Sequence, residues 1–456
     1  MQSRALNEMR AGRGRGNKTA ALCCLRGRSA VMVVAVALAV LVCCQAPAQK
    51  VMNLLPTAFI RAPQTVTNLQ VALWDTGIPG QRECLTELVR AFQSVHPGVR
   101  VCLEWRDAAE AEHWVPRWCD GFRQYAPDVT VMTDLWVRQY RRDLLVLDRE
   151  LRHDLQQRFV PAVLAQGGEP GPLRGVPWSV ATPALYYRSD LLAEAGIKPP
   201  GDFAELVECA AALADPPERY GFGLPGVGGG AEELLYALAV AAGGEMADEE
   251  GKIAPTAQPF ETALGLLVEL QSRGALEPKV LTWTEVELAE MLVEGRLAMM
   301  VGGPWLGAML EDAKKRAEGE AEEEAEEAAE RGLEYAIVPL PREPEGAVHV
   351  TVDWLVAFRD TDRSEQALKL LAFLAQAQSQ RALTTLGGVP ATWGLCAEMG
   401  RVAPWAAHTE GLAQGRGLPR RDWPRLKAQL GNALTYALSG RQGVSEALES
   451  AEDVTP

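Results

Sequence analysis

The 456-residue chain has few of the residues and motifs that carry common enzyme chemistry. Only five histidines occur, and none stands in an H-E-x-x-H metal motif or beside a recognisable nucleophile. The chain has no G-x-S-x-G turn and no Walker loop, and the glycine run at 226–230 lacks the Lys and Ser or Thr of a phosphate cradle. The sequence therefore gives an enzyme no positive support, and we expect neither a cofactor nor a metal.

Cysteine and positive charge are also scarce. Of the nine cysteines, the five beyond residue 48 are odd in number and scattered without a C-x-x-C pair, which argues against a metal cluster and a disulfide-dense fold. Two readings stay open for Cys84, Cys102 and Cys119: one disulfide between two of them, or buried free thiols. Acidic residues outnumber basic ones by 60 to 45, and this net charge of −15 disfavours a nucleic-acid partner.

The only long apolar run lies at residues 31–44 and indicates export. Seven basic residues and one acid precede it, and the small residues Ala46-Pro47-Ala48 follow it. This order predicts a secretory signal peptide at 1–48, followed by a polar tether at 49–68, because the run is shorter than the ~20 residues of a membrane span. A lipid anchor at Cys43 or Cys44 is the open alternative. Removing 1–48 leaves a net charge near −21.

Beyond the tether, strand and helix patterns alternate, which predicts an α/β fold. Strands are expected at 69–74, 99–105, 128–133, 184–187, 297–301, 334–338 and 350–358. Helices are expected at 81–96, 202–213, 234–242, 364–380 and 425–438, with a turn at 175–178. The Glu-rich segment 311–332 is expected to form a solvated helix, since its composition favours helix and contains nothing for a core.

Tryptophan is unusually frequent: twelve occur, against nine Phe and eight Tyr. Six of them follow predicted strands or turns, and they are Trp74, Trp136, Trp178, Trp305, Trp354 and Trp393. Ligands of open α/β sheets bind beyond the carboxyl ends of strands, where indole faces can stack on sugar rings. A single Trp is more often a core residue, but several of these adjoin acids, namely Asp75, Asp134 and Asp353. Together they predict a sugar-binding cleft.

Six blocks in order resemble the carbohydrate-binding extracellular solute-binding proteins of ABC importers, the group that includes maltose-binding protein. They cover about 69–451 and read VALWDTGIPGQRECLTELVRAFQSVHPGVRV, APDVTVMTDLWVRQY, LRGVPWSVATPALYYRSDLLAEAGIKPP, EGRLAMMVGGPW, AIVPLPREPEG and ALSGRQGVSEALESAED. The third is the most specific, although Arg188 replaces the family's usual Asn. The fourth matches a G-x-x-A-M-x₃-G-x-W element that includes Gly303 and whose Trp, here Trp305, stacks on ligand.

The resemblance implies a two-lobe, periplasmic-binding-protein type II fold, with a helix-flanked sheet in each lobe and the ligand cleft between them. Lobe one is placed at 69–180 and 350–389, and lobe two at 181–349, with the acidic insert 311–332, and 390–456. Across the cleft, Trp74, Asp75, Asp134 and Trp136 would face Trp178, Thr182, Glu233 and Trp305. Asp353 and Trp354 lie at a lobe crossing where the family more often has Gly, which implies a narrower pocket.

The resemblance also implies a function: capture of a mono- to oligosaccharide or related polyol by cleft closure, and delivery to an ABC permease in the cytoplasmic membrane. We expect an exported monomer, in the periplasm or on the outer face of the membrane. Carboxylates among the predicted contacts favour a neutral polyhydroxyl ligand over an anionic one. The alternatives are a secreted carbohydrate-active enzyme and a non-transporting surface receptor lipoprotein.

Overall fold

The computed structural model describes residues 66–78, 80–167, 171–226, 230–244, 246, 253–277, 279–320, 334–419 and 423–452, with the side chains of 317–320 left out. The predicted signal peptide and lipid-anchor cysteines lie outside the described residues. So do the tether up to residue 65 and the part of the acidic segment from 321 to 332. The account below therefore concerns the unit that begins at Val66.

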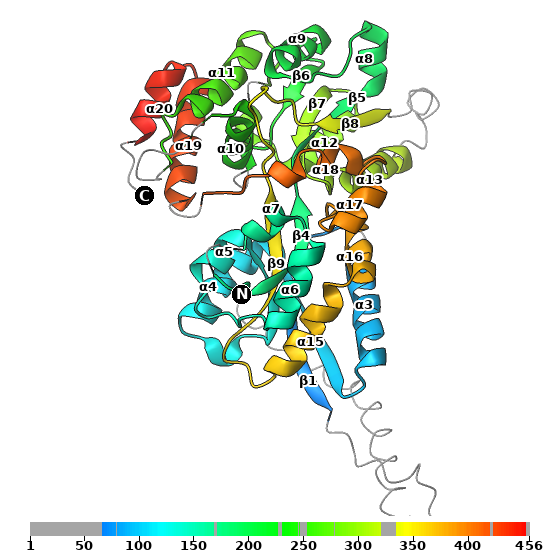
Figure 1. The fold of residues 1–456 in the computed structure, drawn as a ribbon. Coiled ribbons are helices and arrows are strands. Elements are labelled where there is room, and N and C mark those ends of the chain that lie inside the picture. The colour runs from blue at the N-terminus through cyan, green and yellow to red at the C-terminus, as the bar shows by residue number, and fades with distance from the viewer. Residues whose placement is uncertain are drawn as a thin grey trace, which may run out of the picture. The chain divides into compact units, whose positions relative to one another are not determined.

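The first sheet has five strands in the order β2-β1-β3-β9-β4 (Figure 1). The strands are β1 (Thr67–Asp75), β2 (Val99–Asp107), β3 (Val129–Thr133), β4 (Gly175–Ala181) and β9 (Thr351–Ala357). β1 pairs parallel with β2 and β3, whereas β9 runs antiparallel to both β3 and β4. β9 lies between β3 and β4 in this sheet although it follows all the strands of the second sheet in the sequence, so the chain leaves the first sheet and later returns to it.

The second sheet has four strands in the order β6-β7-β5-β8. They are β5 (Ala184–Arg188), β6 (Tyr220–Gly223), β7 (Leu297–Gly302) and β8 (Tyr335–Pro339). β7 is buried at all six positions, as its continuous apolar sequence LAMMVG requires for a strand that is covered on both faces.

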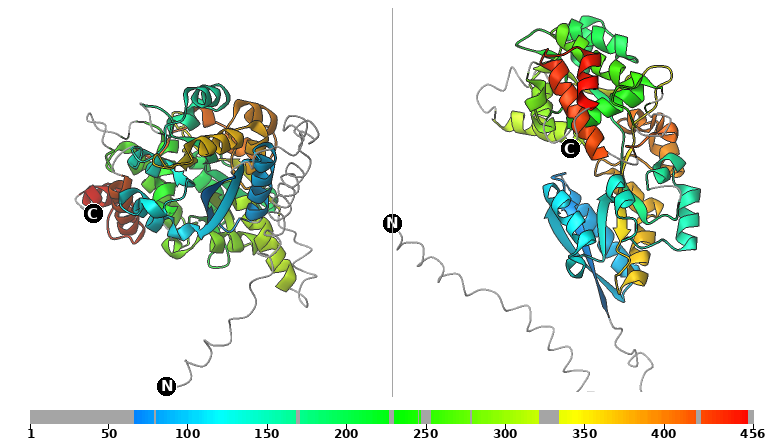
Figure 2. Two further views of the ribbon diagram at one scale, coloured as in Figure 1. Left: turned by 90° about the horizontal axis from the view of Figure 1, so that it is seen from below. Right: turned by 90° about the vertical axis from the view of Figure 1, so that its left-hand side faces the viewer.

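Helices pack around both sheets, and Figure 2 shows them from two further sides. Those near the first sheet are α3 (Gln81–Val95), α4 (Ala111–Asp120), α5 (Asp134–Gln139), α6 (Arg149–Arg158), α7 (Pro161–Ala165), α15 (Ser364–Leu374) and α16 (Ala377–Thr384). The others are α8 (Ser189–Ala195), α9 (Phe203–Leu213), α10 (Gly230–Ala242), α11 (Gln258–Ser272), α12 (Glu285–Val293), α13 (Leu306–Glu320), α17 (Trp393–Met399), α18 (Trp405–Thr409), α19 (Trp423–Leu438) and α20 (Val444–Glu452). Short 3-10 turns lie at Ala108–Glu110, Arg123–Tyr125, Val280–Thr282 and Leu412–Gln414.

Two sequence-based expectations were wrong in detail. The predicted turn at 175–178 is the start of β4, whose pairing with β9 shifts register between Pro177 and Ser179. This bulge accommodates a proline, which has no N–H to donate to a ladder. The single helix expected at 364–380 is instead two helices, α15 and α16, separated at Ala375 and Gln376.

Each sheet has its own hydrophobic core. One core joins β1, β3, β4 and β9 to α3 and α15, a second joins β5, β7, α9, α10, α11 and α19, and a third joins β5 and β7 to α12 and α13. The chain passes from the first sheet to the second between β4 and β5, and it returns between β8 and β9. Residues that flank these connections are therefore placed where elements of the two sheets meet.

The five cysteines of this unit are free thiols: Cys84, Cys102, Cys119, Cys209 and Cys396. Of the two readings left open for the first three, the structure supports the thiols. Burial raises the pKa of Cys119 to about 12 and that of Cys396 to about 11. Neither group is therefore a reactive thiolate near neutral pH.

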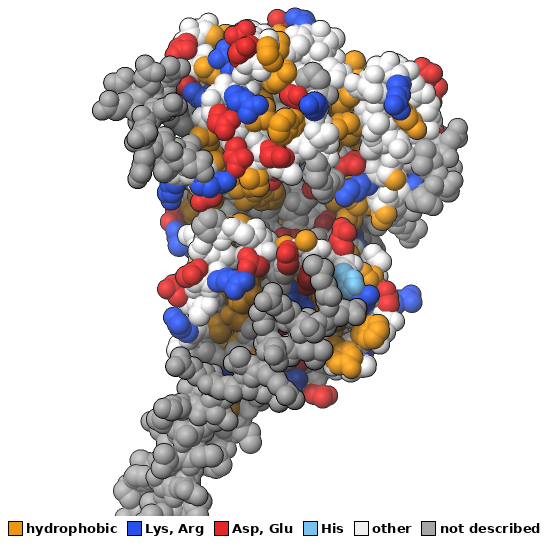
Figure 3. Space-filling view, turned by 180° about the vertical axis from the view of Figure 1, so that it is seen from behind, with side chains coloured by type: hydrophobic (Ala, Val, Ile, Leu, Met, Phe, Trp, Pro, Cys, Tyr) orange, Lys and Arg blue, Asp and Glu red, His pale blue; other side chains and the backbone are white. Residues whose placement is uncertain are grey.

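Charged side chains of both signs are interspersed on the face shown in Figure 3, with apolar side chains between them. Among the described residues, most ion pairs have at least one exposed side chain, and those between Lys369 and Glu365 and between Arg381 and Glu398 are exposed on both sides. Such pairs contribute little to stability. We therefore attribute the stability of this unit mainly to its apolar cores.

Candidate ligand-binding cleft

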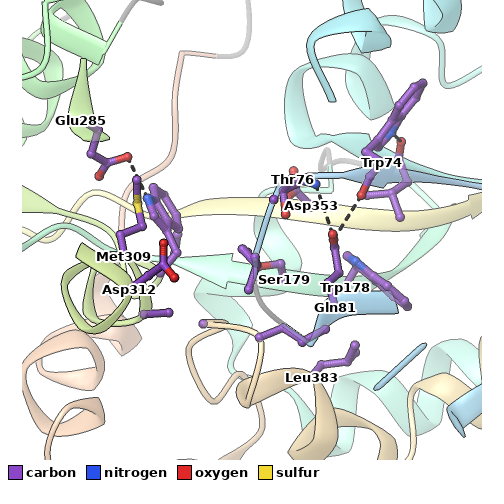
Figure 4. A pocket seen from close by; sticks show the side chains of 18 of the residues that line it. Trp74, Thr76, Gln81, Trp178, Ser179, Glu285, Met309, Asp312, Asp353 and Leu383 are labelled. Atoms are coloured by element: carbon purple, nitrogen blue, oxygen red, sulfur yellow. Dashed lines mark hydrogen bonds between the residues drawn. The ribbon is translucent and has the colours of Figure 1, made fainter. Parts of the chain in front are cut away.

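A cavity of about 680 Å³ lies between elements of the two sheets. Its lining is mostly apolar and has three indoles: Trp74 and Trp178 come from strands of the first sheet, and Trp305 precedes α13 (Figure 4). Polar groups line it from both sides as well, including Thr76, Gln81, Ser179, Thr351, Asp353, Glu285, Asp312 and Arg316. Apolar walls with a few placed polar groups are the usual construction of a small-molecule site.

Trp74 is held rigidly at the end of β1. Its Nε1 donates to the Val131 carbonyl oxygen at 2.8 Å, and its ring stacks on Trp118 with centroids 5.8 Å apart. The residue is only 8% exposed. Trp74 therefore presents a small, fixed part of its ring to the cavity.

The buried Gln81 fixes the loop that follows β1. Its side-chain nitrogen donates to the Trp74 carbonyl at 3.1 Å, and its oxygen accepts from the Thr76 backbone N–H at 3.1 Å (Figure 4). Gln81 is the first residue of α3, so the helix and the loop are locked together. This arrangement places Thr76 and Gly77 along the cavity wall.

The bulge of β4 brings two more side chains to the cavity. Trp178 lies within it, and Ser179 stands opposite Asp353 of β9, which is in turn opposite Thr133 of β3. Gly175 begins the strand where a Cβ would lie 2.8 Å from Cγ1 of Val356. The close approach of β4 to β9 thus explains the glycine and aligns Ser179 with Asp353.

Trp305 faces the cavity from the other side, and its indole is oriented by Glu285 at the start of α12. Its Nε1 donates to Oε2 of Glu285 at 2.9 Å. The ring lies over Gly303, where a Cβ would be 2.3 Å from the ring atom Cη2. Gly387, with φ of +81°, packs against the Trp305 backbone, and a Cβ there would lie 2.9 Å from Cα. The two glycines leave room for this one orientation.

The carboxylates in the cavity are poorly compensated. Burial, together with the nearby acids Asp134 and Glu233, raises the pKa of Asp353 to about 7. Burial also raises the pKa of Glu285, and the hydrogen bond from Trp305 only partly opposes that effect. Acids whose pKa is raised in a cleft are candidate functional groups, because a bound ligand can stabilise the ionised carboxylate.

A further polar cluster adjoins Asp353. Asp134, the first residue of α5, is 2% exposed and forms an ion pair with Arg138 at 2.9 Å. Burial raises its pKa, although Arg138 and His349 act in the opposite direction. His349 lies 3.7 Å from Oε1 of Glu233, a half-exposed residue of α10. None of these residues lines the cavity itself.

Of the twelve predicted contact residues, the structure brings four to the cavity: Trp74, Trp178, Trp305 and Asp353. The others lie elsewhere. Asp75 accepts from Arg82 at 2.9 Å and lines a separate open surface pocket beside Trp105 and Arg106.

The remaining seven are either packed inside or turned away. Asp134 and Glu233 belong to the adjoining cluster, and Gly303 lies beneath Trp305. Thr182 is buried and donates to the His408 carbonyl at 2.7 Å, and Trp354 is 0% exposed in the first core. Trp136 packs partly buried against that core, and Trp393 is 48% exposed. Their roles as ligand contacts stay predictions.

Sequence reasoning missed several polar lining residues, above all Gln81, Ser179, Glu285 and Thr351. Glu285 follows Thr284, which forms a capping box with Glu287, so its sequence context predicts only a helix start. The sequence context of Gln81 likewise predicts only that it lies in the first turn of a helix. Side chains of these types become site residues only through the approach of distant elements.

Within the described part of the chain, no group of three or more His, Cys, Asp or Glu side chains is arranged to hold a metal ion. Nor does any described helix combine the length and apolarity needed to cross a membrane.

The family of bacterial extracellular solute-binding proteins matches residues 127–381, more than half of the chain. The protein belongs to this family, as the sequence predicted. Relatives are distant: a Brucella abortus (strain 2308) protein named only as a binding protein is 24% identical over 304 residues, 64% of this chain and 68% of its own. A maltotriose-binding protein of Pyrococcus abyssi is 22% identical over 278 residues, 60% of this chain and 53% of its own.

Solved structures share the fold. The GacH receptor of Streptomyces glaucescens, known unliganded and with acarbose, superposes with a TM-score of 0.70 at 20% identity, covering 85% of this chain and 97% of that one. A solute-binding protein of Agrobacterium radiobacter in complex with ribitol gives 0.65 at 20% identity, covering 86% and 98%. The predicted α/β fold, with two helix-flanked sheets, is thereby confirmed.

Proposed function

We propose that this protein binds a sugar or related polyol outside the cytoplasmic membrane and delivers it to an ABC permease. The observation that carries the proposal is the cavity lined from one side by Trp74 and Trp178 and from the other by Trp305, with Asp353 and Glu285 among its polar groups. Indole faces can stack on the C–H faces of a sugar ring, and carboxylates accept hydrogen bonds from its hydroxyls. Family membership supports the extracellular, solute-binding part of this function.

In this mechanism, the ligand first contacts one wall and the other wall then closes on it. The connections between β4 and β5 and between β8 and β9 would act as hinges, since each passes from one sheet to the other. A ligand that contacts both walls favours the closed state by its differential affinity, and the permease would distinguish that state. The role is binding without a chemical step.

Export follows from the family, and two routes remain in the proposal. Cleavage after Ala48 would release a monomer that begins at Gln49, whereas acylation of Cys43 or Cys44 would tether it to the outer face of the membrane. Mass spectrometry of the mature protein distinguishes the two, because only the second leaves a lipid-modified N-terminal cysteine.

The binding proposal is tested by titrating the mature protein with a panel of mono-, di- and oligosaccharides and polyols, following Trp fluorescence. At least one ligand is expected to change the emission saturably. Trp305→Ala should weaken that ligand at least about tenfold without unfolding the protein, since stacking on an aromatic side chain contributes ~1–3 kcal/mol for nucleic-acid bases and should be of similar order for a sugar.

Tyr125→Ala serves as the matched control, because Tyr125 is a 68% exposed aromatic residue away from the cavity. It should leave affinity unchanged. Emission that stays flat for the whole panel, or equal losses in both variants, would argue against the proposal.

A further inference from the structure

The cavity has two carboxylates without a basic partner, and they come from opposite walls. Asp353 on β9 makes no side-chain hydrogen bond or ion pair with any described residue, and Glu285 on α12 accepts only the Trp305 N–H and pairs with no described base. Figure 4 shows them on the two sides of the cavity. Both are partly buried, so each ionised form is only partly solvated, and no described base supplies a counter-charge.

Among the described residues that line the cavity, one is basic, and it already forms ion pairs with two acids. Arg316 is the only base among the lining residues described, and it pairs with Glu290 at 2.6 Å and with Asp312 at 3.4 Å. Its side chain is half exposed, which places it at the rim. The interior between Asp353 and Glu285 therefore has a net negative charge.

The three indoles add to this preference. An aromatic face attracts a cation through the negative charge of its ring surface, and the attraction grows when water is excluded. Trp74, Trp178 and Trp305 thus favour the same sign of charge as the two carboxylates. A neutral ring would stack on these indoles and its hydroxyls would donate to the carboxylates, but only a cation would also balance their negative charge.

We propose that the ligand carries a protonated amine, as an amino sugar or a short oligomer of amino sugars, with its ammonium group beside Asp353. This inference rests on the proposed function and names its substrate class. The ammonium group supplies the counter-charge that the lining lacks, and the remaining hydroxyls reach Ser179, Thr351 and Thr76.

Binding should be linked to pH through Asp353. The acids that face it are Asp134 from α5 and Glu233 from α10, while its strand neighbours Thr133 and Ser179 are uncharged. Because its pKa without a cation nearby is about 7, the ammonium group binds best once Asp353 has lost its proton. Affinity for an amino sugar should therefore rise by up to about tenfold per pH unit from pH 5 to pH 7, until the amine itself loses its proton.

The experiment compares amino sugars with neutral parents of the same size by calorimetry at low salt. The pairs are glucosamine with glucose, galactosamine with galactose, and the chitosan dimer with cellobiose, and spermidine serves as an amine without a sugar ring. At least one amino sugar is expected to bind about tenfold or more tightly than its parent. Asp353→Asn should weaken binding of the amino sugar about tenfold more than binding of its neutral parent and so remove the preference, whereas the exposed Glu112→Gln should keep it.

The outcomes separate this inference from the proposed function. A neutral parent that binds as tightly as its amino form, or tighter, overturns the amine inference and leaves sugar binding intact. Binding of spermidine alone, or of nothing in either panel, overturns both. A preference that survives Asp353→Asn unchanged would also overturn the assignment of the ammonium site.

Discussion

Trp305 is held by neighbours that each restrict the indole ring. Glu285 fixes its N–H at 2.9 Å, Gly303 lies beneath the ring, and Gly387 packs on its backbone. The ring can therefore be aligned for a ligand before the ligand arrives, which lowers the entropy cost of binding.

We predict that Glu285 positions Trp305. Glu285→Gln keeps an oxygen acceptor for the indole N–H, whereas Glu285→Leu leaves that N–H unpaired, so only the Leu variant should free the ring. Its affinity for a neutral ligand should fall about three- to tenfold, the effect of losing one hydrogen bond. The ¹⁹F resonance of fluorotryptophan 305, assigned with Trp305→Phe, should shift or broaden in the Leu variant alone. An unchanged resonance in Glu285→Leu would contradict this role.

We also predict that Asp353 lowers stability at high pH. Its folded-state pKa of about 7 exceeds the ordinary 3.8, so the folded state holds a proton that the unfolded chain has lost, and stability falls as pH rises from about 4 to about 7. Asp353→Asn cannot ionise and should be more stable than the wild type by about 1–3 kcal/mol at pH 8, with the gain shrinking toward pH 4. Urea unfolding at both pH values measures this, and a less stable variant at pH 8 would contradict it.

Elements far apart in the sequence meet at a buried histidine. His408 of α18 is 0% exposed, and its Nδ1 donates to the Thr182 carbonyl at 2.8 Å. Its Nε2 lies 3.1 Å from the Tyr186 hydroxyl, which donates to the Gly303 carbonyl at 3.0 Å. The network thus ties the β4–β5 connection to the residues that precede Trp305.

We predict that acid weakens this network. Burial lowers the pKa of His408 to about 4, although its hydrogen bond to Thr182 acts in the opposite direction. In the unfolded chain this histidine binds a proton near its ordinary pKa of 6.5, whereas in the folded protein it stays neutral down to about pH 4. The free energy of unfolding therefore falls by about 2–3 kcal/mol as the pH drops from about 6.5 to about 4.

His408→Gln should be less stable than the wild type at pH 7, yet it should lose less on acidification to pH 4.5. His113→Gln, at an exposed site, should behave like the wild type. Equal acid sensitivity of the wild type and His408→Gln would show that the network does not sense pH.

Element by element, the sequence predicted most strands and helices, because alternating and 3.6-residue patterns are local. It failed where tertiary pairing overrode a local signal: G-V-P-W resembles a turn, but β9 pairs with it and a bulge absorbs Pro177. The sequence likewise predicted only some of the site residues, because local patterns do not reveal long-range packing. Alternation along β9 turns Asp353 to the cavity and Trp354 to the core, whereas Gln81 and Glu285 enter the site only through long-range packing.

At the scale of the whole molecule, the cavity depends on elements that are distant in the sequence. β9 follows all four strands of the second sheet in the sequence, yet it lies in the first sheet, where it brings Asp353 beside β3 and β4. Glu285 and Trp305 belong to the intervening segment. The wall with Trp74, Trp178 and Asp353 packs on the core of the first sheet, whereas α12 and α13, beside Glu285 and Trp305, pack on a separate cluster with β5 and β7. This arrangement allows one wall to move against the other.

The central claim is that one ligand is held between these two walls, and calorimetry on a Trp178→Ala, Trp305→Ala double-mutant cycle tests it most directly. For a sugar identified in the panel, each single variant should weaken binding at least about tenfold. The double variant should show coupling between the sites, because both indoles contact the same ring system in the closed state. Full affinity in either single variant would contradict the account, as would a failure of every sugar to bind.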